Sequence, residues 1–98
     1  MQYLISWNVN SAPKKPPFIQ HIIQKYSPMA LCLQETRLTL QINFTLKNYV
    51  MFRRNADSEN RPKGGVSIAI SKNLPADEVS INTPLQAIVV HIQHQTLI

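Results

Sequence analysis

The chain has 98 residues, enough for one small domain, and its 44% of hydrophobic residues permits a core and excludes global disorder. Its formal net charge of +5 suits a polyanionic partner, nucleic acid first, although an ordinary basic protein shows the same balance. No apolar run approaches membrane-spanning length, and the amino terminus does not resemble a signal peptide, so we expect an intracellular protein with no membrane partner. The single cysteine, Cys32, lies in an apolar run and is expected to be a reduced core residue.

The first elements that the sequence predicts are a strand and a helix. Residues 2–9 alternate between two faces and end in polar residues, with Trp7 on the face expected to join the core. A loop rich in proline and lysine follows over residues 10–17. Apolar residues then recur at helical spacing from Phe18 to Tyr26, and Ser27-Pro28 ends the helix.

The next stretch, residues 29–37, begins as a dense apolar run and becomes polar at Gln34-Glu35-Thr36. A strand that is apolar on both faces is typical of a covered, usually parallel sheet, whose ligands gather beyond the carboxyl ends of its strands. If the two strands are parallel neighbours, Asn8 and Glu35 lie side by side, roughly 5 Å apart across the sheet. Their amide and carboxylate oxygens would suit Mg²⁺. Taken alone, Glu35 would read as an acidic residue that faces water at a strand end.

The middle of the chain is basic. Residues 38–47 leave helix and loop open, and residues 48–54 predict a strand. Residues 53–63 are charged and rich in turn formers, with four basic side chains that could contact phosphates: Arg53, Arg54, Arg61 and Lys63. An ordinary exposed hairpin loop explains the same segment equally well.

Three further strands are predicted after this loop. Residues 64–71 alternate large and small side chains, which would let a second layer pack closely on the small face. Residues 78–81 and 85–93 predict shorter strands, and His91 and His94 would point to opposite faces, so a metal shared by the two histidines is not expected. Residues 96–98 resemble the start of another strand, and we therefore expect the chain to be part of a larger domain.

Several of these segments together resemble a known family. Residues 5–11 (ISWNVNS), 31–36 (LCLQET) and 64–70 (GGVSIAI) are similar to the first three signatures of the endonuclease/exonuclease/phosphatase, or DNase I-like, superfamily. The likeness is closest to the amino-terminal endonuclease domain of jockey-type non-LTR retrotransposons, where the nick primes reverse transcription. Residues 82–90 resemble a run that precedes the middle strands of that domain.

The resemblance implies an α/β fold, with residues 1–98 forming the amino-terminal half of a four-layer α-β-β-α sandwich. It implies Mg²⁺-dependent nicking of DNA, with Mn²⁺ as an alternative ion, in an intracellular and nuclear protein. By the resemblance, Glu35 matches the metal-binding glutamate, and Asn8 matches the asparagine beside the metal and the scissile phosphate.

The chain also departs from this family. The catalytic tyrosine, the Asp-x-Asn pair and the late Ser-Asp-His are not recognisable, and Asp57, Asp77 and His91 match none of them. We therefore expect the isolated chain to be inactive as a nuclease, and the rest of a longer polyprotein or a second copy to be its partner. The alternative is a non-catalytic nucleic-acid-binding or interaction module. A phosphatase of the same superfamily fits the basic loop less well.

Overall fold

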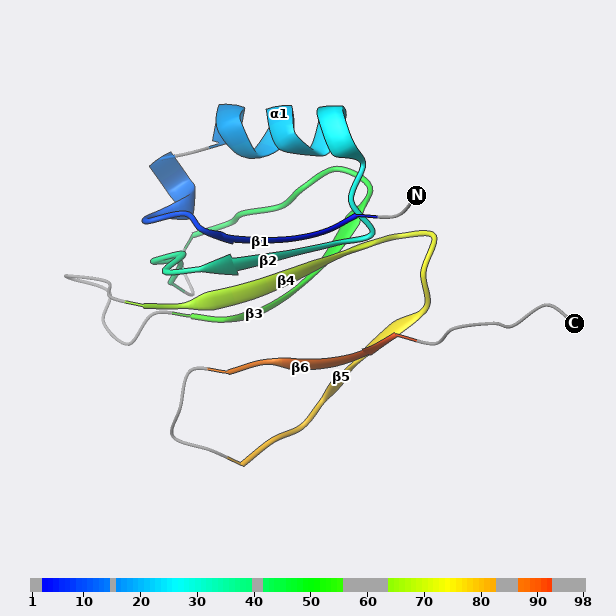
Figure 1. The fold of residues 1–98 in the computed structure, drawn as a ribbon. Helices are drawn as coiled ribbons and strands as arrows, with labels where there is room; N and C mark the ends of the chain where they lie inside the picture. Colours follow the sequence, from blue (N-terminus) through cyan, green and yellow to red (C-terminus); the bar gives the residue numbers. More distant parts are fainter. Residues whose placement is uncertain (1–2, 15, 40–41, 56–63, 83–86, 93–98) are drawn as a thin grey trace, which may run out of the picture.

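The computed structural model describes residues 3–14, 16–39, 42–55, 64–82 and 87–92. Within them the chain is a small α/β domain, rich in strands, with one α-helix and two sheets. The helix α1 (Pro16–Tyr26) covers one face of a four-stranded sheet, and a two-stranded sheet lies on the other side (Figure 1). Among the described residues, no helix has the length and apolar character needed to cross a membrane.

The first three elements form the expected βαβ unit. Strand β1 (Leu4–Asn8) leads through a 3-10 turn, η1 (Ala12–Lys14), into α1 and then into β2 (Ala30–Gln34). The two strands are parallel neighbours, so this prediction is confirmed. The turn η1 falls where only a loop was predicted.

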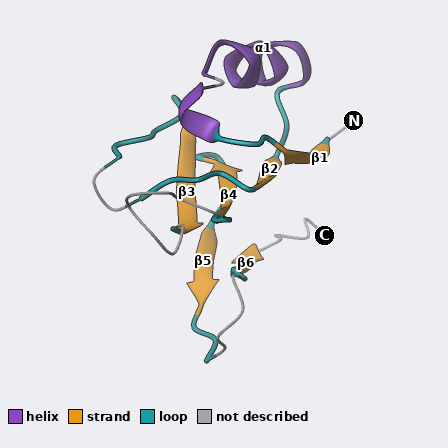
Figure 2. Cartoon of the chain, turned by 90° about the vertical axis from the view of Figure 1, so that its left-hand side faces the viewer, coloured by secondary structure: helices purple, strands orange, loops and turns teal. Residues whose placement is uncertain are grey.

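The four-stranded sheet has the order β1-β2-β4-β3. Figure 2 shows β1 and β3 as its two outer strands. Strands β3 (Tyr49–Arg54) and β4 (Val66–Ser71) are antiparallel to each other, and β4 is antiparallel to β2. Both agree with the predicted strands. The described residues between β2 and β3 form no helix or strand, which settles the alternative that the sequence left open in favour of a loop.

The second sheet pairs β5 (Ala76–Val79) with β6 (Val89–Ile92) in antiparallel fashion. The predicted strand over residues 78–81 is shifted, because a hydrogen-bonded turn (Leu74 N to Ser71 O, 3.0 Å) lets the extended chain begin directly after Pro75. The predicted strand over residues 85–93 is described only in part. A cavity of about 210 Å³ lies between the sheets, where Ala87 and Ile88 face residues of β2 and β4.

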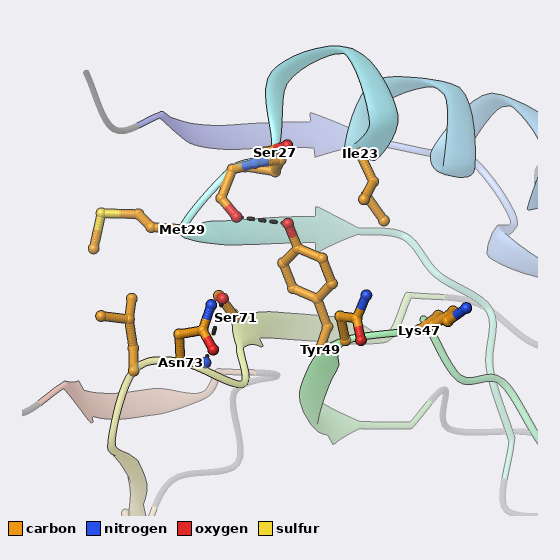
Figure 3. Close-up of a pocket in the computed structure, with 10 residues that line it drawn as sticks. Ile23, Ser27, Met29, Lys47, Tyr49, Ser71 and Asn73 are labelled. Atoms are coloured by element: carbon orange, nitrogen blue, oxygen red, sulfur yellow. Dashed lines mark hydrogen bonds between the residues drawn. The ribbon is translucent and has the colours of Figure 1, made fainter.

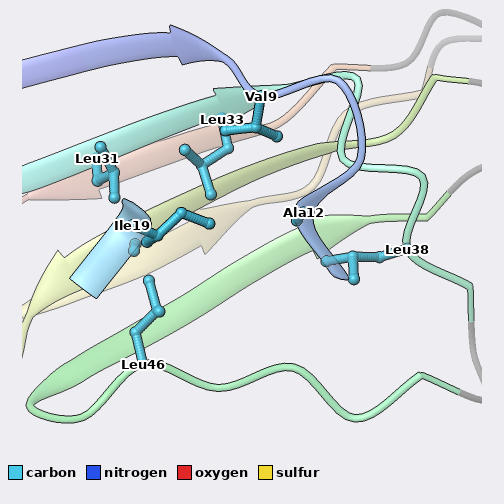
Figure 4. Packing of buried hydrophobic residues seen from close by; sticks show 8 residues of the cluster. Val9, Ala12, Ile19, Leu31, Leu33, Leu38 and Leu46 are labelled. Atoms are coloured by element: carbon cyan, nitrogen blue, oxygen red, sulfur yellow. The ribbon is translucent and has the colours of Figure 1, made fainter. Parts of the chain in front are cut away.

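The core lies between α1, the four-stranded sheet and the loop before β3 (Figure 4). Ile19 of α1 packs with Leu31 and Leu33 of β2, and the loop contributes Leu38 and Leu46. The small residue Ala69 on β4 lies in the same cluster, as the alternation of large and small side chains predicted. Trp7 is partly buried against this cluster. Burying one such Leu or Ile side chain stabilises the fold by roughly 1.5–3 kcal/mol.

Candidate metal centre

Asn8 and Glu35 lie near each other at the edge of the four-stranded sheet where the carboxyl ends of the two parallel strands lie. Asn8 lies directly across from Gln34, and Glu35 is the next residue of the same chain. The pairing continues past the strands, because Val9 N donates to Gln34 O at 3.0 Å and Ser11 N to Glu35 O at 2.8 Å. The two candidate ligands therefore start from neighbouring strands about 5 Å apart, with Glu35 one residue further along the chain than the direct partner of Asn8.

The backbone at this edge is held in an unusual conformation. Asn10, Ser11, Glu35 and Arg37 all have positive φ, between 48° and 86°. The left-handed region costs a residue with a side chain roughly 1–2 kcal/mol, and such residues concentrate at functional sites. The chain turns sharply after Gln34, so the alternation of the strand no longer determines where Glu35 points.

Hydrogen bonds from both neighbours hold this turn in place. Ala12 N donates to Thr36 O at 2.8 Å from the β1 side. Thr36 N and Arg37 N donate to Gly65 O and Gly64 O, at 3.1 and 2.8 Å, from the β4 side. Both glycines have positive φ, and Thr36 is fully buried. The turn that presents Glu35 is therefore fixed between β1 and β4.

The side chains at this edge are open to solvent and rich in oxygen. Glu35 is exposed, and its carboxylate makes no hydrogen bond or ion pair with any described residue. Asn8 is also exposed, and its Oδ1 accepts a long hydrogen bond of 3.3 Å from Asn10 N, which leaves an amide lone pair available. One carboxylate, one amide oxygen and several waters make a set of ligands that Mg²⁺ accepts. The donor chemistry of the two residues thus fits the ion.

Gln34 has a supporting position beside this pair. Its Nε2 donates to Ser6 Oγ at 2.9 Å and joins β2 to β1 on the face of the sheet that carries Asn8. This bond restrains the last residue of β2, directly before Glu35. Gln34 therefore contributes to the geometry of the edge without being a ligand.

The four basic residues predicted to contact phosphates divide into three cases. The Arg53 guanidinium donates through Nη2 to Thr39 O at 2.6 Å and Ile42 O at 2.9 Å, and so binds the loop before β3. Arg54 lies in the same row across the sheet as Asn8, through the pairs Asn8–Gln34, Gln34–Val66 and Val66–Arg54. Three strand spacings put its backbone roughly 14 Å from that of Asn8. Arg61 and Lys63 lie outside the described residues.

The titratable side chains described on the second sheet lie away from this edge. Asp77 and His91 face each other across β5 and β6, and both are exposed. His94 lies outside the described residues. In the described part of the chain, no three His, Cys, Asp or Glu side chains gather closely enough to share a metal.

Cys32 lies on the face of β2 that looks toward the second sheet and lines the cavity between the two sheets. It is free, as predicted, but only half-buried. Burial raises the pKa of the Cys32 thiol above its ordinary value, which keeps it protonated and poorly nucleophilic.

A larger hollow of about 360 Å³ lies at the other end of the sheet, where β2 begins and β4 ends (Figure 3). The Tyr49 ring spans it, and the Tyr49 hydroxyl donates to Pro28 O at 2.6 Å. Burial raises the pKa of Tyr49. The Tyr49 hydroxyl at this hollow is therefore already engaged by a hydrogen bond within the fold.

No protein-family model matches the chain, and a search of curated proteins finds no match. The assignment of the candidate metal site therefore depends on the residues and geometry of this chain. The sequence had not singled out Asn10 or Ser11, whose left-handed backbone connects the end of β1 to Glu35. The available signal was the Asn-Ser pair directly after a strand, because Asn adopts this conformation more readily than most residues.

Proposed function

We propose that this chain supplies the Asn8–Glu35 half of a Mg²⁺-dependent DNA endonuclease site of the DNase I-like type. The observation that carries the proposal is the position of the exposed Asn8 and Glu35 side chains on adjacent parallel strands, fixed by left-handed turns. This arrangement agrees with the role that the sequence resemblance assigns to each residue.

The layered arrangement of the helix and the two sheets supports the same proposal. The helix α1, the four-stranded sheet and the two-stranded sheet follow one another in the order α-β-β (Figure 1). We propose that they correspond to the first three layers of a four-layer α-β-β-α sandwich, and that the chain is the amino-terminal half of a jockey-type retrotransposon endonuclease domain. The cavity that Ala87 and Ile88, directly before β6, line together with residues of β2 and β4 supports this layering.

In this proposal Glu35 and Asn8 hold the ion, whose charge would stabilise the phosphate and the leaving oxygen during phosphodiester hydrolysis. Arg54 lies in the Asn8 row and extends the site toward a second phosphate of the same DNA. The net charge of +5 favours association with DNA in a salt-dependent manner. No general base is assigned to this chain, and general acid–base catalysis is worth a factor of about 10²–10⁴.

The alternative function is a nucleic-acid-binding module without catalysis. One observation favours it: among the described acidic residues, only Glu35 lies at this edge, while Asp77 and Glu78 are on β5. The two functions differ in whether Glu35 binds a divalent ion.

Titration calorimetry with Mn²⁺ and Mg²⁺ tests the proposal. The wild-type chain should bind one ion, Glu35→Gln should lose most of this affinity, and Glu78→Gln, which removes an exposed carboxylate on β5, should retain it. Supercoiled plasmid incubated with the chain should stay intact in Mg²⁺ and in EDTA alike. Equal affinities of the two variants would overturn the metal site. Nicking that requires both Mg²⁺ and Glu35 would show that the chain has a complete site.

A further inference from the structure

Strand β1 is an edge strand with outward-facing backbone groups. In a parallel ladder, the N–H and C=O of a given residue point to the same side, and successive residues alternate. Val9 N bonds to β2, so the outward groups of β1 belong to Leu4, Ser6 and Asn8. Among the described residues no strand lies beyond β1, which stands at one side of the four-stranded sheet in Figure 2.

The β1 edge lacks the features that protect the other edge of the same sheet. Natural edge strands are usually guarded by charged residues, proline or bulges. Strand β3 carries Arg53 and Arg54, whereas residues 3–8 contain no charge and no proline. Leu4 is 68% exposed and Tyr3 42%, so apolar side chains accompany the open backbone.

The spacing of the outward groups makes this edge complementary to itself. If two copies pair antiparallel with Ser6 opposite Ser6, Leu4 of each copy lies opposite Asn8 of the other. Each of these three pairs joins residues that both have outward groups. An antiparallel hydrogen-bonded pair exchanges two N–H to O=C bonds. The arrangement therefore satisfies every outward group of β1 in both copies, with six hydrogen bonds around a two-fold axis.

We propose that β1 pairs with β1 of a second copy of this chain and joins the two four-stranded sheets into one continuous sheet. This inference does not depend on the metal site. It concerns the backbone edge of β1 and the exposed Tyr3 and Leu4 side chains. Because each copy carries a charge of +5, repulsion opposes the dimer, and added salt should strengthen it by screening.

Sedimentation equilibrium over a dilution series tests the dimer with three variants of equal charge. Wild type should approach twice the 11.2 kDa of one chain. Ser6→Lys puts like charges opposite each other at the two-fold axis and should weaken the dimer by about tenfold or more. Leu4→Lys should also weaken it and leaves the Ser6–Gln34 hydrogen bond intact. Gln24→Lys on the exposed side of α1 should match wild type.

Amide hydrogen exchange gives a second, site-specific measurement. The Ser6 amide points outward and should become protected as protein concentration rises. The Trp7 amide points to β2 and should be protected at every concentration. Circular dichroism confirms that each variant is folded. A monomeric wild type, open-ended association, or equal dimerisation of wild type, Ser6→Lys and Leu4→Lys would each overturn the proposal.

Discussion

The two ends of the four-stranded sheet differ in how their polar groups are used. At the end that carries Asn8 and Glu35, backbone hydrogen bonds hold the turns that follow β1 and β2, and the oxygen-bearing side chains are exposed. At the other end, the hollow is larger, but the Tyr49 hydroxyl that reaches across it is bonded to Pro28 O. A rigid backbone with unused ligand atoms is what a binding site needs, so the size of a hollow is the poorer guide here.

Residues with positive φ occur at both ends of the sheet, but for different reasons. Asn10, Ser11, Glu35 and Arg37 gather at the first end, while Ser27 and Asn48 line the hollow at the second. Ser27 directly follows α1, and its N–H donates to Ile23 O at 2.8 Å, which is an ordinary way for a helix to finish. Asn48 immediately precedes β3. Positive φ at the second end therefore has a local structural cause, whereas at the first end it redirects Glu35.

The largest effect on stability is expected from Arg53, which we assign to the fold rather than to DNA. Arg53→Met should lower the free energy of unfolding by about 1.5–3 kcal/mol, because it leaves the Thr39 and Ile42 carbonyls without their charged donor. Urea denaturation measures this change. Lys47→Met, which removes an exposed cation from the same loop, should change it by less than about 0.5 kcal/mol. Similar stability of the two variants would return Arg53 to the phosphate-binding candidates.

A smaller effect is expected at the second end of the sheet. Tyr49→Phe removes the hydroxyl that donates to Pro28 O and should destabilise the fold by about 1 kcal/mol. Affinity for Mn²⁺ should stay unchanged, because Tyr49 is on the far side of the sheet from Glu35. Thermal unfolding and calorimetry on the same sample measure both quantities. Tyr26→Phe, at another partly exposed tyrosine, is the matched control. Loss of metal affinity in Tyr49→Phe would contradict the separation of the two ends.

The βαβ unit and the strand positions could be predicted because they depend on local patterns. The apolar run before Gln34, the helical spacing from Phe18 to Tyr26 and the alternation over residues 66–71 each identify an element directly. The parallel pairing of the two strands that such a unit forms then makes Asn8 and Glu35 neighbours. This reasoning supplied the central pair of the candidate site.

What the sequence did not reveal depends on contacts between distant segments. The bonds from Arg53 to Thr39 and Ile42 require the loop to fold back along β3, and no local pattern indicates this. The left-handed backbone of Glu35 is held by hydrogen bonds between its turn and the segments that follow β1 and precede β4, since glutamate itself disfavours this conformation. Spacing alone could not separate Arg53 from Arg54, although the pleat places them on opposite faces.

The smallest effect tests whether the Glu35 backbone is strained for the benefit of its side chain. Glu35→Gly should be more stable than Glu35→Ala by about 0.5–1 kcal/mol, because glycine accepts the φ of 51° without a steric cost. Both variants remove the carboxylate and should lose Mn²⁺ affinity equally. At Glu78, which lies in β5, the order should reverse, with alanine the more stable. Glu35→Ala as stable as Glu35→Gly would mean that the turn relaxes without cost. The first end of the sheet would then owe its geometry to the hydrogen bonds of Ser11, Thr36 and Arg37 alone.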